Sequence, residues 1–356
     1  MNSSPSQPTL AHVPARSGNP YLHLFYEHLG QAGIHVLANT HLWRRWLFKL
    51  WSPLPDYVHF HWPGSEYGHR HAWRTPFRAL RFFLLLKVLR SAGVRIMWTF
   101  HNLMPHEGPH GRLGRDLRQR MVDRSDLILV NFRESAQHLS DIHGRSHDVH
   151  WVPHGSYAGH YPDTRTGAEA RRELGIEEDA FVFLVFGSIR PYKNITGVIE
   201  AFKLLEDPRA RLLIAGRAMI PSYARTIRAL AEQDARIIVH DWTIPDEDVQ
   251  NFFRGSDMIV LPRTAYSSGT AVLALDFGLP LLAPRVNHVA EIALDRAVVP
   301  LQGESTGELL EGLQRALATD LAGAREDALR SSQKLAWDPI AESLADILRA
   351  DHAERS

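Results

Sequence analysis

Short apolar runs of β type alternate with amphipathic helical patterns along almost the whole chain, and this alternation constrains the fold most. Strands buried on both faces form continuous apolar runs, and a strand–helix alternation is typical of parallel sheets covered by helices. The first half supplies strands in DYVHFHW (56–62), VRIMWTF (94–100), LILVNF (127–132) and VHWVP (149–153), with helices over 72–91 and 111–124. We therefore predict an α/β protein.

The segment YPDTRTGAEARRELGIEEDA, residues 161–180, interrupts this alternation with Pro, Gly and charged residues, which favours a domain boundary. A second alternating series follows it. We predict an N-terminal domain over 1–160, a C-terminal domain over 161–336, and a last helix over 337–356 that carries an apolar stripe. A chain of 356 residues suits two such doubly wound, Rossmann-like domains facing a cleft.

The composition excludes several classes of protein. Lys plus Arg equals Asp plus Glu at 40 each, so we expect no nucleic-acid partner. The absence of cysteine removes disulfides, thiolate nucleophiles and thiolate metal sites. The first residues, MNSSPSQPTLAHVPARSG, do not have the pattern of a secretion signal, and the longest apolar run, FFLLL, is too short to span a bilayer. We expect a cytoplasmic protein.

Two segments of the second half have the composition of an anion site. In FVFLVFGSIRPYKN (181–194) an apolar strand ends at Gly187 and is followed by Arg190 and Lys193. In open α/β sheets, ligands bind beyond the carboxyl ends of strands, where helix N-terminal amides face anions. The segment YSSGTAVLALDFGLP (266–280) begins a helix with small hydroxyl residues and glycine. A diphosphate site is one interpretation, and solvated cations with ordinary helix caps are the other.

The order FGSIRPYKN, LLIAG, HDWTIPDEDVQ, VLP and SSGTAVLALDFGLPLLAP resembles the donor domain of GT-B glycosyltransferases. The segments NPYLHLFYEHL (19–29), HFHWP (59–63) and TFHNLMPHE (99–107) are similar to the GDP-mannose-dependent β-mannosyltransferases of xanthan-type exopolysaccharide assembly. The resemblance covers most of residues 19–350. It implies a nucleotide-sugar donor, a glycan or polyprenyl-diphosphate-linked acceptor in bacterial polysaccharide synthesis, and no cofactor or metal.

The resemblance also implies that Trp337 and the helix after it cross back to the first domain. It further implies where the substrates bind. Its donor positions correspond to Arg190 and Lys193 at the diphosphate, Asp241 and Trp242 near the nucleobase, and Ser268, Gly269 and Thr270 at the phosphate or sugar. On the acceptor side we expect Asn19, Tyr21 and Glu66.

One departure from the retaining GT-B pattern concerns the mechanism. Retaining enzymes of family 4 carry two glutamates eight positions apart, and aligning on GLP puts Ala265 and Leu273 there. Neither side chain can hydrogen-bond a sugar hydroxyl. We therefore expect inversion, with a β product from an α-linked donor. A retaining, family 4-like transferase using a UDP-sugar and a non-catalytic nucleotide-sugar-binding subunit are the alternatives.

An inverting displacement needs a base for the proton of the acceptor hydroxyl. The candidates at N-terminal strand ends are His59, His61, Glu66, His101, His106 and Glu107, of which we select His61, His101 and Glu107. Histidine is favoured because its ordinary pKa lies near working pH, whereas a glutamate needs burial. Strand alternation puts His59 and His61 on one face. A hydrogen-bonded structural histidine is the alternative for each.

Histidines 59, 61, 69 and 71 form two His-x-His pairs. Such pairs bind metal only where the four rings converge, and nothing in the intervening loop fixes them together. We expect no metal site.

Two stretches combine aromatic and basic residues. The first, HLWRRWLFKLW (41–51), fits a helix lying on an anionic bilayer or one covering the N-terminal sheet, and both interpretations stay open. The second, WRTPFRALRFFLLLKVLR (73–90), is similar, but its FFLLL run predicts a core helix. If the first stretch binds lipid, the protein works at the inner face of the cell membrane.

Overall fold

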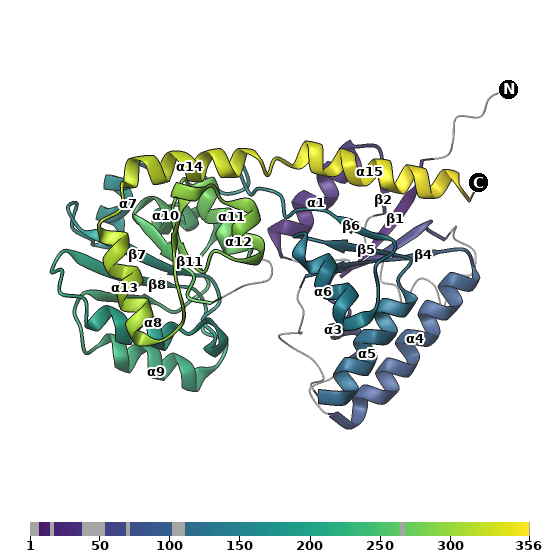
Figure 1. Cartoon of the computed structure of the whole chain (residues 1–356), viewed down its shortest axis with the longest axis horizontal. Helices are drawn as coiled ribbons and strands as arrows, with labels where there is room; N and C mark the ends of the chain where they lie inside the picture. The colour runs from purple at the N-terminus through teal and green to yellow at the C-terminus, as the bar shows by residue number, and fades with distance from the viewer. Residues whose placement is uncertain are drawn as a thin grey trace. The chain divides into compact units, whose positions relative to one another are not determined.

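The computed structural model describes residues 7–14, 18–37, 54–68, 72–101, 111–263 and 268–355. The chain divides into two compact units: unit 1 comprises 1–155 and 337–356, and unit 2 comprises 156–336. Within the described residues, each unit contains one six-stranded parallel sheet flanked by helices (Figure 1). The predicted α/β class with two doubly wound sheets is confirmed.

Unit 1 is built on strands that pair in the order β2-β1-β3-β4-β5-β6. Its strands are β1 (Thr9–Val13), β2 (His35–Val36), β3 (Tyr57–Phe60), β4 (Arg95–Phe100), β5 (Leu127–Val130) and β6 (Val149–Trp151). Its helices are α1 (Pro20–Gln31), α3 (Gly64–Tyr67), η1 (Ala72–Arg74), α4 (Thr75–Ser91), α5 (Gly111–Arg124), α6 (Glu134–His143) and α15 (Trp337–Ala353). Helices α3 to α6 contribute to one buried cluster with the strands, and α1 packs with α15 (Figure 1).

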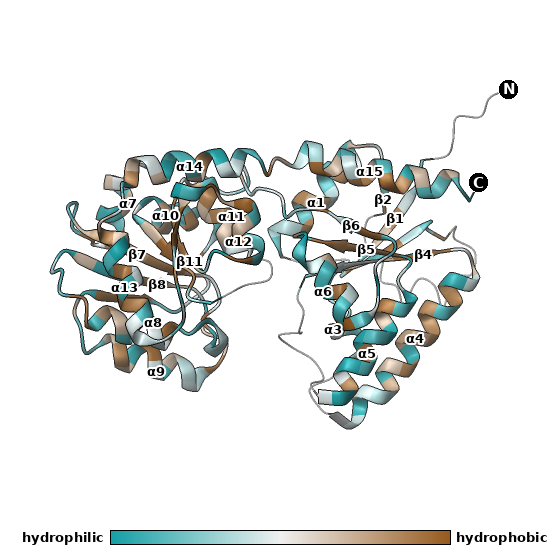
Figure 2. Cartoon of the chain, in the orientation of Figure 1, coloured by the Kyte–Doolittle hydropathy of each residue, from teal (hydrophilic) through white to brown (hydrophobic). Residues whose placement is uncertain are grey.

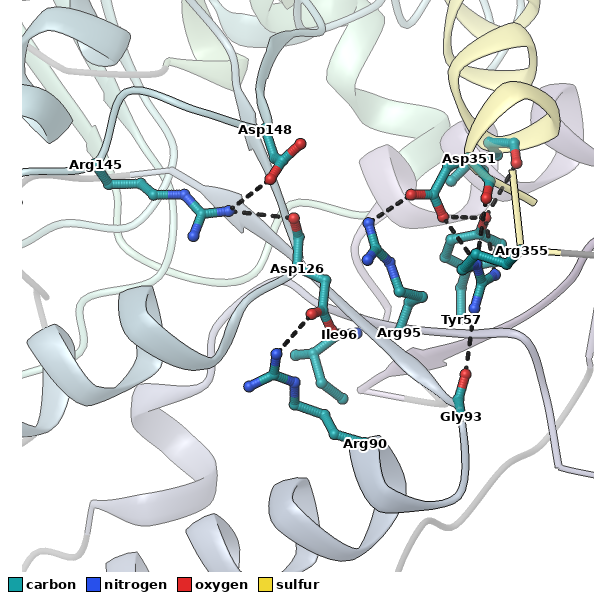
Figure 3. A network of polar contacts seen from close by, with 11 residues as sticks. Tyr57, Arg90, Gly93, Arg95, Ile96, Asp126, Arg145, Asp148, Asp351 and Arg355 are labelled. Carbon is teal, nitrogen blue, oxygen red and sulfur yellow. Dashed lines mark hydrogen bonds and ion pairs between the residues drawn. The ribbon is translucent and has the colours of Figure 1, made fainter. Parts of the chain in front are cut away.

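A polar network ties α15 to the amino-terminal edge of this sheet (Figure 3). Asp351 accepts hydrogen bonds from the Tyr57 hydroxyl at 2.6 Å and from Arg95 Nη2 at 2.5 Å. Arg355 Nη1 donates to the carbonyl oxygen of Gly93 at 3.2 Å. Burial and the neighbouring Asp351 carboxylate raise the pKa of Tyr57, so its hydroxyl stays a donor. The last helix of the chain is therefore part of unit 1.

Unit 2 repeats the doubly wound plan with the order β12-β11-β10-β7-β8-β9. Its strands are β7 (Phe181–Phe186), β8 (Ala210–Ala215), β9 (Ile237–His240), β10 (Met258–Val260), β11 (Leu281–Ala283) and β12 (Val298–Pro300). Its helices are α7 (Gly167–Leu174), η2 (Pro191–Lys193), α8 (Ile195–Lys203), α9 (Pro221–Ala231), η3 (Asp246–Asp248), α10 (Val249–Arg254), α11 (Gly269–Asp276), α12 (Asn287–Ile292), η4 (Asp295–Ala297), α13 (Thr306–Leu317) and α14 (Leu321–Gln333). Helices α8, α9 and α13 share the large buried cluster of this sheet.

Strand order gives each sheet one topological switch point. In unit 1 the chain leaves β1 toward β2 and then returns to β3 on the other side of β1. In unit 2 it runs from β7 through β8 to β9 and then returns to β10 on the other side of β7. Loops diverge at such points, so the carboxyl ends of β1 and β3, and of β7 and β10, are where ligands bind in folds of this kind.

The structure contains features that the sequence patterns did not predict, among them strands β1, β2 and β12. The segment 161–180 contains helix α7, which begins with a capping box between Thr166 and Glu169. Helix α4 is a core helix as predicted, since Phe82, Phe83, Leu85 and Leu86 of the FFLLL run are buried, but it also exposes large apolar residues on its other side. The aromatic-basic stretch 41–51 lies outside the described residues. Among the helices described, none has the length and apolar content needed to cross a bilayer.

Candidate active-site residues

The switch point of unit 2 brings three of the predicted donor residues together. Gly187 follows β7 with a φ of +90°, a conformation that glycine adopts without the cost of a Cβ. A Cβ at Gly187 would lie 3.3 Å from Lys193 Nζ and 3.6 Å from Thr270 Oγ1. The loop after β7 and the start of α11 therefore meet here, as the sheet topology requires. Gly216, after β8, also approaches closely, since a Cβ there would lie 2.3 Å from the Gly187 carbonyl oxygen.

The Lys193 ammonium is held at this strand end by a backbone group. Its Nζ donates to the carbonyl oxygen of Phe186 at 3.3 Å, and within the described residues it makes no ion pair with a carboxylate. Burial, with a smaller contribution from the positive charge of Arg190, lowers the pKa of Lys193 to about 8. A desolvated ammonium of this kind is stabilised by an anion, so the position suits a phosphate group.

Helix α11 begins beside Lys193. The Ser268 side chain caps it by accepting a hydrogen bond from the Ala271 amide at 3.1 Å, and the Ser268 amide donates to His288 Nδ1 at 3.3 Å. Ser268 thus acts as a helix cap, which was one of its two interpretations. The amides of Gly269 and Thr270 lie in the first turn, where backbone N–H groups have no partner inside the helix.

The predicted nucleobase contacts lie at the edge of the sheet, after β9. The Asp241 carboxylate accepts a hydrogen bond from Arg228 Nε at 2.7 Å. Trp242 is 51% exposed, and its ring lies 4.6 Å from that of His240. An exposed indole can stack on a flat ligand. Two strands separate Asp241 and Trp242 from the β7–β10 switch point.

The switch point of unit 1 contains a buried chain of hydrogen bonds. His59 Nε2 lies 2.7 Å from Thr99 Oγ1, and His59 Nδ1 lies 2.7 Å from the Tyr26 hydroxyl. The same hydroxyl lies 2.6 Å from His61 Nε2, and His61 Nδ1 lies 3.0 Å from His101 Nε2. His59 and His61 therefore lie on one face, as strand alternation predicts, and α1 supplies the hydroxyl between them.

The hydrogen atoms of this series of hydrogen bonds can be placed so that every histidine ring is neutral. A neutral imidazole has one N–H and one lone pair, and a tyrosine hydroxyl donates once while accepting from a second group. If His101 Nε2 donates to His61, then His61 donates to Tyr26, Tyr26 to His59, and His59 to Thr99. In this arrangement His101 Nδ1 carries a lone pair. Both ring nitrogens of His61, by contrast, are occupied by protein groups.

Burial holds these rings neutral. His59 and His61 are fully buried, and desolvation lowers the pKa of both well below its usual range, with repulsion from neighbouring histidines adding to the effect. Burial and the nearby His154 lower the pKa of His101 to about 3. The pKa of His154, whose Nδ1 lies 2.9 Å from the Gly155 carbonyl oxygen, falls to about 4. At neutral pH the cluster is uncharged.

Of the three predicted acceptor-side residues, Asn19 and Tyr21 lie at the start of α1, and the Tyr21 ring packs near the buried histidines. Asn19 caps α1 by accepting from the Tyr21 amide at 3.1 Å. The Tyr21 ring is buried, and its centre lies 5.7 Å from that of His61 and 5.6 Å from that of His101. Glu66 lies on α3, outside the hydrogen-bonded chain. The candidates His106, Glu107, His69 and His71 lie outside the described residues.

Four members of this cluster are not among the predicted site residues. Tyr26 links the two strand histidines, His12 stacks on Tyr26 with ring centres 3.9 Å apart, and His154 and Trp337 pack against Tyr21. The signal that could have found His154 is its place after β6, in the loop WVPHG. Tyr26 gives no such signal, because it occupies an ordinary apolar position of a helix.

Comparison with known proteins agrees with this geometry. Residues 167–329 match the model of the family described as glycosyl transferases group 1. A GDP-mannose:glycolipid 4-β-D-mannosyltransferase from Xanthomonas campestris pv. campestris is 27% identical over 304 residues, covering 84% of this chain and 80% of that protein. A D-inositol 3-phosphate glycosyltransferase from Xylanimonas cellulosilytica is 26% identical over 252 residues, covering 67% of this chain and 60% of that protein.

Solved structures give the fold. The sucrose-phosphate synthase from Thermosynechococcus elongatus is similar with a TM-score of 0.74 at 17% identity, covering 98% of this chain and all of that one. The Anabaena protein HepE, solved with UDP and glucose, has a TM-score of 0.71 at 15% identity, with 97% of this chain covered. The chain therefore has the GT-B glycosyltransferase fold. It contains a group 1 glycosyltransferase domain, and it is a hexosyltransferase.

Proposed function

We propose that this enzyme transfers mannose from GDP-mannose, with inversion, to a lipid-linked oligosaccharide in bacterial polysaccharide synthesis. The donor follows from the mannosyltransferase relative, whose similarity extends over 84% of the chain. The geometric observation that carries the proposal is the desolvated Lys193 beside Gly187 and the start of α11. An ammonium, a glycine and helix amides together form a site for a leaving diphosphate.

In the proposed reaction the acceptor hydroxyl oxygen attacks the anomeric carbon. A new C–O bond forms as the bond from that carbon to the diphosphate breaks, and GDP leaves. Lys193, Arg190 and the amides of Gly269 and Thr270 stabilise the charge that develops on the leaving group. The proton of the acceptor hydroxyl passes to a base.

His101 is the base in this proposal, and His61 is a positioning residue. Both nitrogens of His61 are occupied by Tyr26 and His101, whereas among the described residues the only further side-chain hydrogen-bond partner of His101 is Asn131, outside this chain of rings. His101 enters the reaction neutral, with a lone pair. Its pKa of about 3 makes the free ring a weak base, so the proposal requires the charge of the bound donor to raise that pKa. The hydrogen bonds through His61 and Tyr26 hold the His101 ring in place.

Inversion is supported by Leu273. A retaining enzyme of family 4 has a glutamate at this place in α11, and here the residue is a buried leucine. Its side chain offers neither charge nor a hydrogen bond to a donor sugar.

A nucleotide-binding experiment tests the donor site. Isothermal titration with GDP, UDP, ADP and dTDP should give selective binding of GDP, and Lys193→Ala should weaken it about ten- to a hundredfold, the value of a hydrogen bond to a charged group. Lys203→Ala is the matched control, because that ammonium pairs with Glu200 on the outside of α8. Selective binding of UDP would overturn the donor assignment, and unchanged GDP binding by Lys193→Ala would overturn the diphosphate site.

A kinetic experiment tests the base. His101→Gln should lower kcat about a hundredfold or more and leave GDP affinity unchanged, because a base acts in the transition state. The matched control is His147→Gln, at an exposed histidine of the same unit. A rate that survives in His101→Gln means that another group takes the proton.

A further inference from the structure

Helix α4 and the turn before it expose a stripe of large apolar side chains, which we name the α4 stripe. Its members and their exposed fractions are Trp73 (65%), Phe77 (71%), Leu80 (61%), Leu84 (53%) and Val88 (64%). They are three or four positions apart, so they lie along one side of the helix over about 22 Å. The opposite side packs on the sheet through Ala79, Phe82, Phe83, Leu85, Leu86 and Leu89. Figure 2 shows apolar residues along the length of α4.

Basic residues border this stripe on both sides. Between residues 72 and 91 the chain has five basic residues and no acidic one. At 3.6 residues per turn, Arg74, Arg78 and Arg81 fall on one side of the stripe, while Lys87 and Arg90 fall on the other. An exposed apolar stripe between rows of cations is the pattern of a helix that lies in the interface of an anionic bilayer.

A hollow of about 1020 Å³ opens beside the carboxyl-terminal half of the α4 stripe. Its wall includes Leu80, Leu84 and Lys87 of α4, and Arg120, Asp123 and Arg124 of α5. Deeper in the same wall, acidic partners neutralise the arginines (Figure 3): Arg90 pairs with Asp126 at 2.9 Å, and Arg95 pairs with Asp351.

Two cations of the hollow lack an ion-pair partner among the described residues. Lys87 and Arg120 are both exposed, and neither forms an ion pair with any residue that the structure describes. The hollow thus joins apolar helix surface to positive charge. An anionic lipid matches both, because it has apolar chains and a negatively charged headgroup.

We infer that the α4 stripe and its basic borders bind the surface of an anionic lipid bilayer, with lipid phosphates at Lys87 and Arg120. Monomeric proteins rarely expose so continuous an apolar surface without a partner. Charge favours lipid over a second copy of this chain, because α4 carries no carboxylate and the wall of the hollow contains more arginine and lysine than acidic residues. The inference stands on unit 1 alone and does not rest on the proposed donor or acceptor.

Vesicle co-sedimentation of the full chain tests the inference. The protein should bind vesicles of phosphatidylcholine with phosphatidylglycerol, bind vesicles of phosphatidylcholine alone far less, and dissociate as salt rises. The double variant Phe77→Ser/Leu84→Ser should weaken partitioning at least about tenfold, since each side chain gives up apolar burial. Lys87→Gln/Arg120→Gln should weaken it about 25-fold, at about fivefold for each charge near an anionic surface.

The matched control is Ile142→Ser/Leu204→Ser, which removes two apolar side chains that are each 57% exposed and lie outside the stripe. It should bind vesicles as the unchanged protein does. All variants should keep their GDP affinity and far-UV circular dichroism, which separates this inference from the donor assignment and from misfolding. Unchanged vesicle binding by Phe77→Ser/Leu84→Ser would overturn the inference. A dimer in solution that this variant dissociates would also overturn it, by assigning the stripe to a second copy.

Discussion

Acidification should destabilise unit 1 through its neutral histidines. Burial lowers the pKa of His101 from 6.5 to about 3 and that of His154 from 6.5 to about 4. Because the unfolded chain binds more protons than the folded chain between these values, stability is complete above pH 6.5 and is lost as pH falls. From pH 7 to pH 5.5 each of the two histidines costs about 1.2 kcal/mol, so together they remove about 2.5 kcal/mol. The lowered pKa values of His59 and His61 add to this loss of stability as the pH falls.

Urea unfolding followed by tryptophan fluorescence measures this loss. Of the nine tryptophans, only Trp242 belongs to unit 2, so the signal reports unit 1. The free energy of unfolding should fall by at least about 2.5 kcal/mol between pH 7 and pH 5.5. In His101→Gln the fall should be smaller by about 1.2 kcal/mol, whatever the variant does to stability at pH 7. His147→Gln, at an exposed position, should show the full fall. An equal fall in both variants would refute the explanation.

Three further predictions concern the two switch points. GDP affinity should fall about tenfold between pH 7 and pH 9 and be accompanied by proton uptake in calorimetry, because Lys193 has a pKa of about 8 and a bound anion raises it. Gly187→Ala should weaken GDP binding, since its Cβ would crowd Lys193 and Thr270; Gly159→Ala, at a positive φ in open space, controls for backbone strain alone. Tyr26→Phe should lower the free energy of unfolding by about 2 to 4 kcal/mol, measured by urea titration, because two buried ring nitrogens lose their partner.

Much of the fold could be predicted because the sequence patterns that indicate its strands extend over only a few residues. Continuous apolar runs predicted β3 to β6 of unit 1, whereas the short strands β1 and β2 were not predicted. The order of β7 and β10 brings Gly187, Lys193 and Thr270 to one point by topology alone. Strand alternation likewise places His59 and His61 together.

Other features depend on tertiary packing or on a weaker signal. The position of α1 over the sheet decides that Tyr26 bridges the two strand histidines, and no sequence pattern fixes that position. Helix α4 is apolar on most sides, so its periodicity cannot say which side is buried. The α7 helix did carry a signal, the spacing of Thr166 and Glu169, which outweighs the Pro and Gly residues around it.

The most direct test of the proposed function is the anomeric configuration of the product. Purified enzyme is incubated with GDP-mannose and a polyprenyl-diphosphate-linked oligosaccharide, and the new linkage is determined by NMR from the coupling between the anomeric carbon and its hydrogen. The proposal predicts a β-mannosyl product that His101→Gln forms far more slowly. An α-mannosyl product would contradict the inverting mechanism and remove the need for a base.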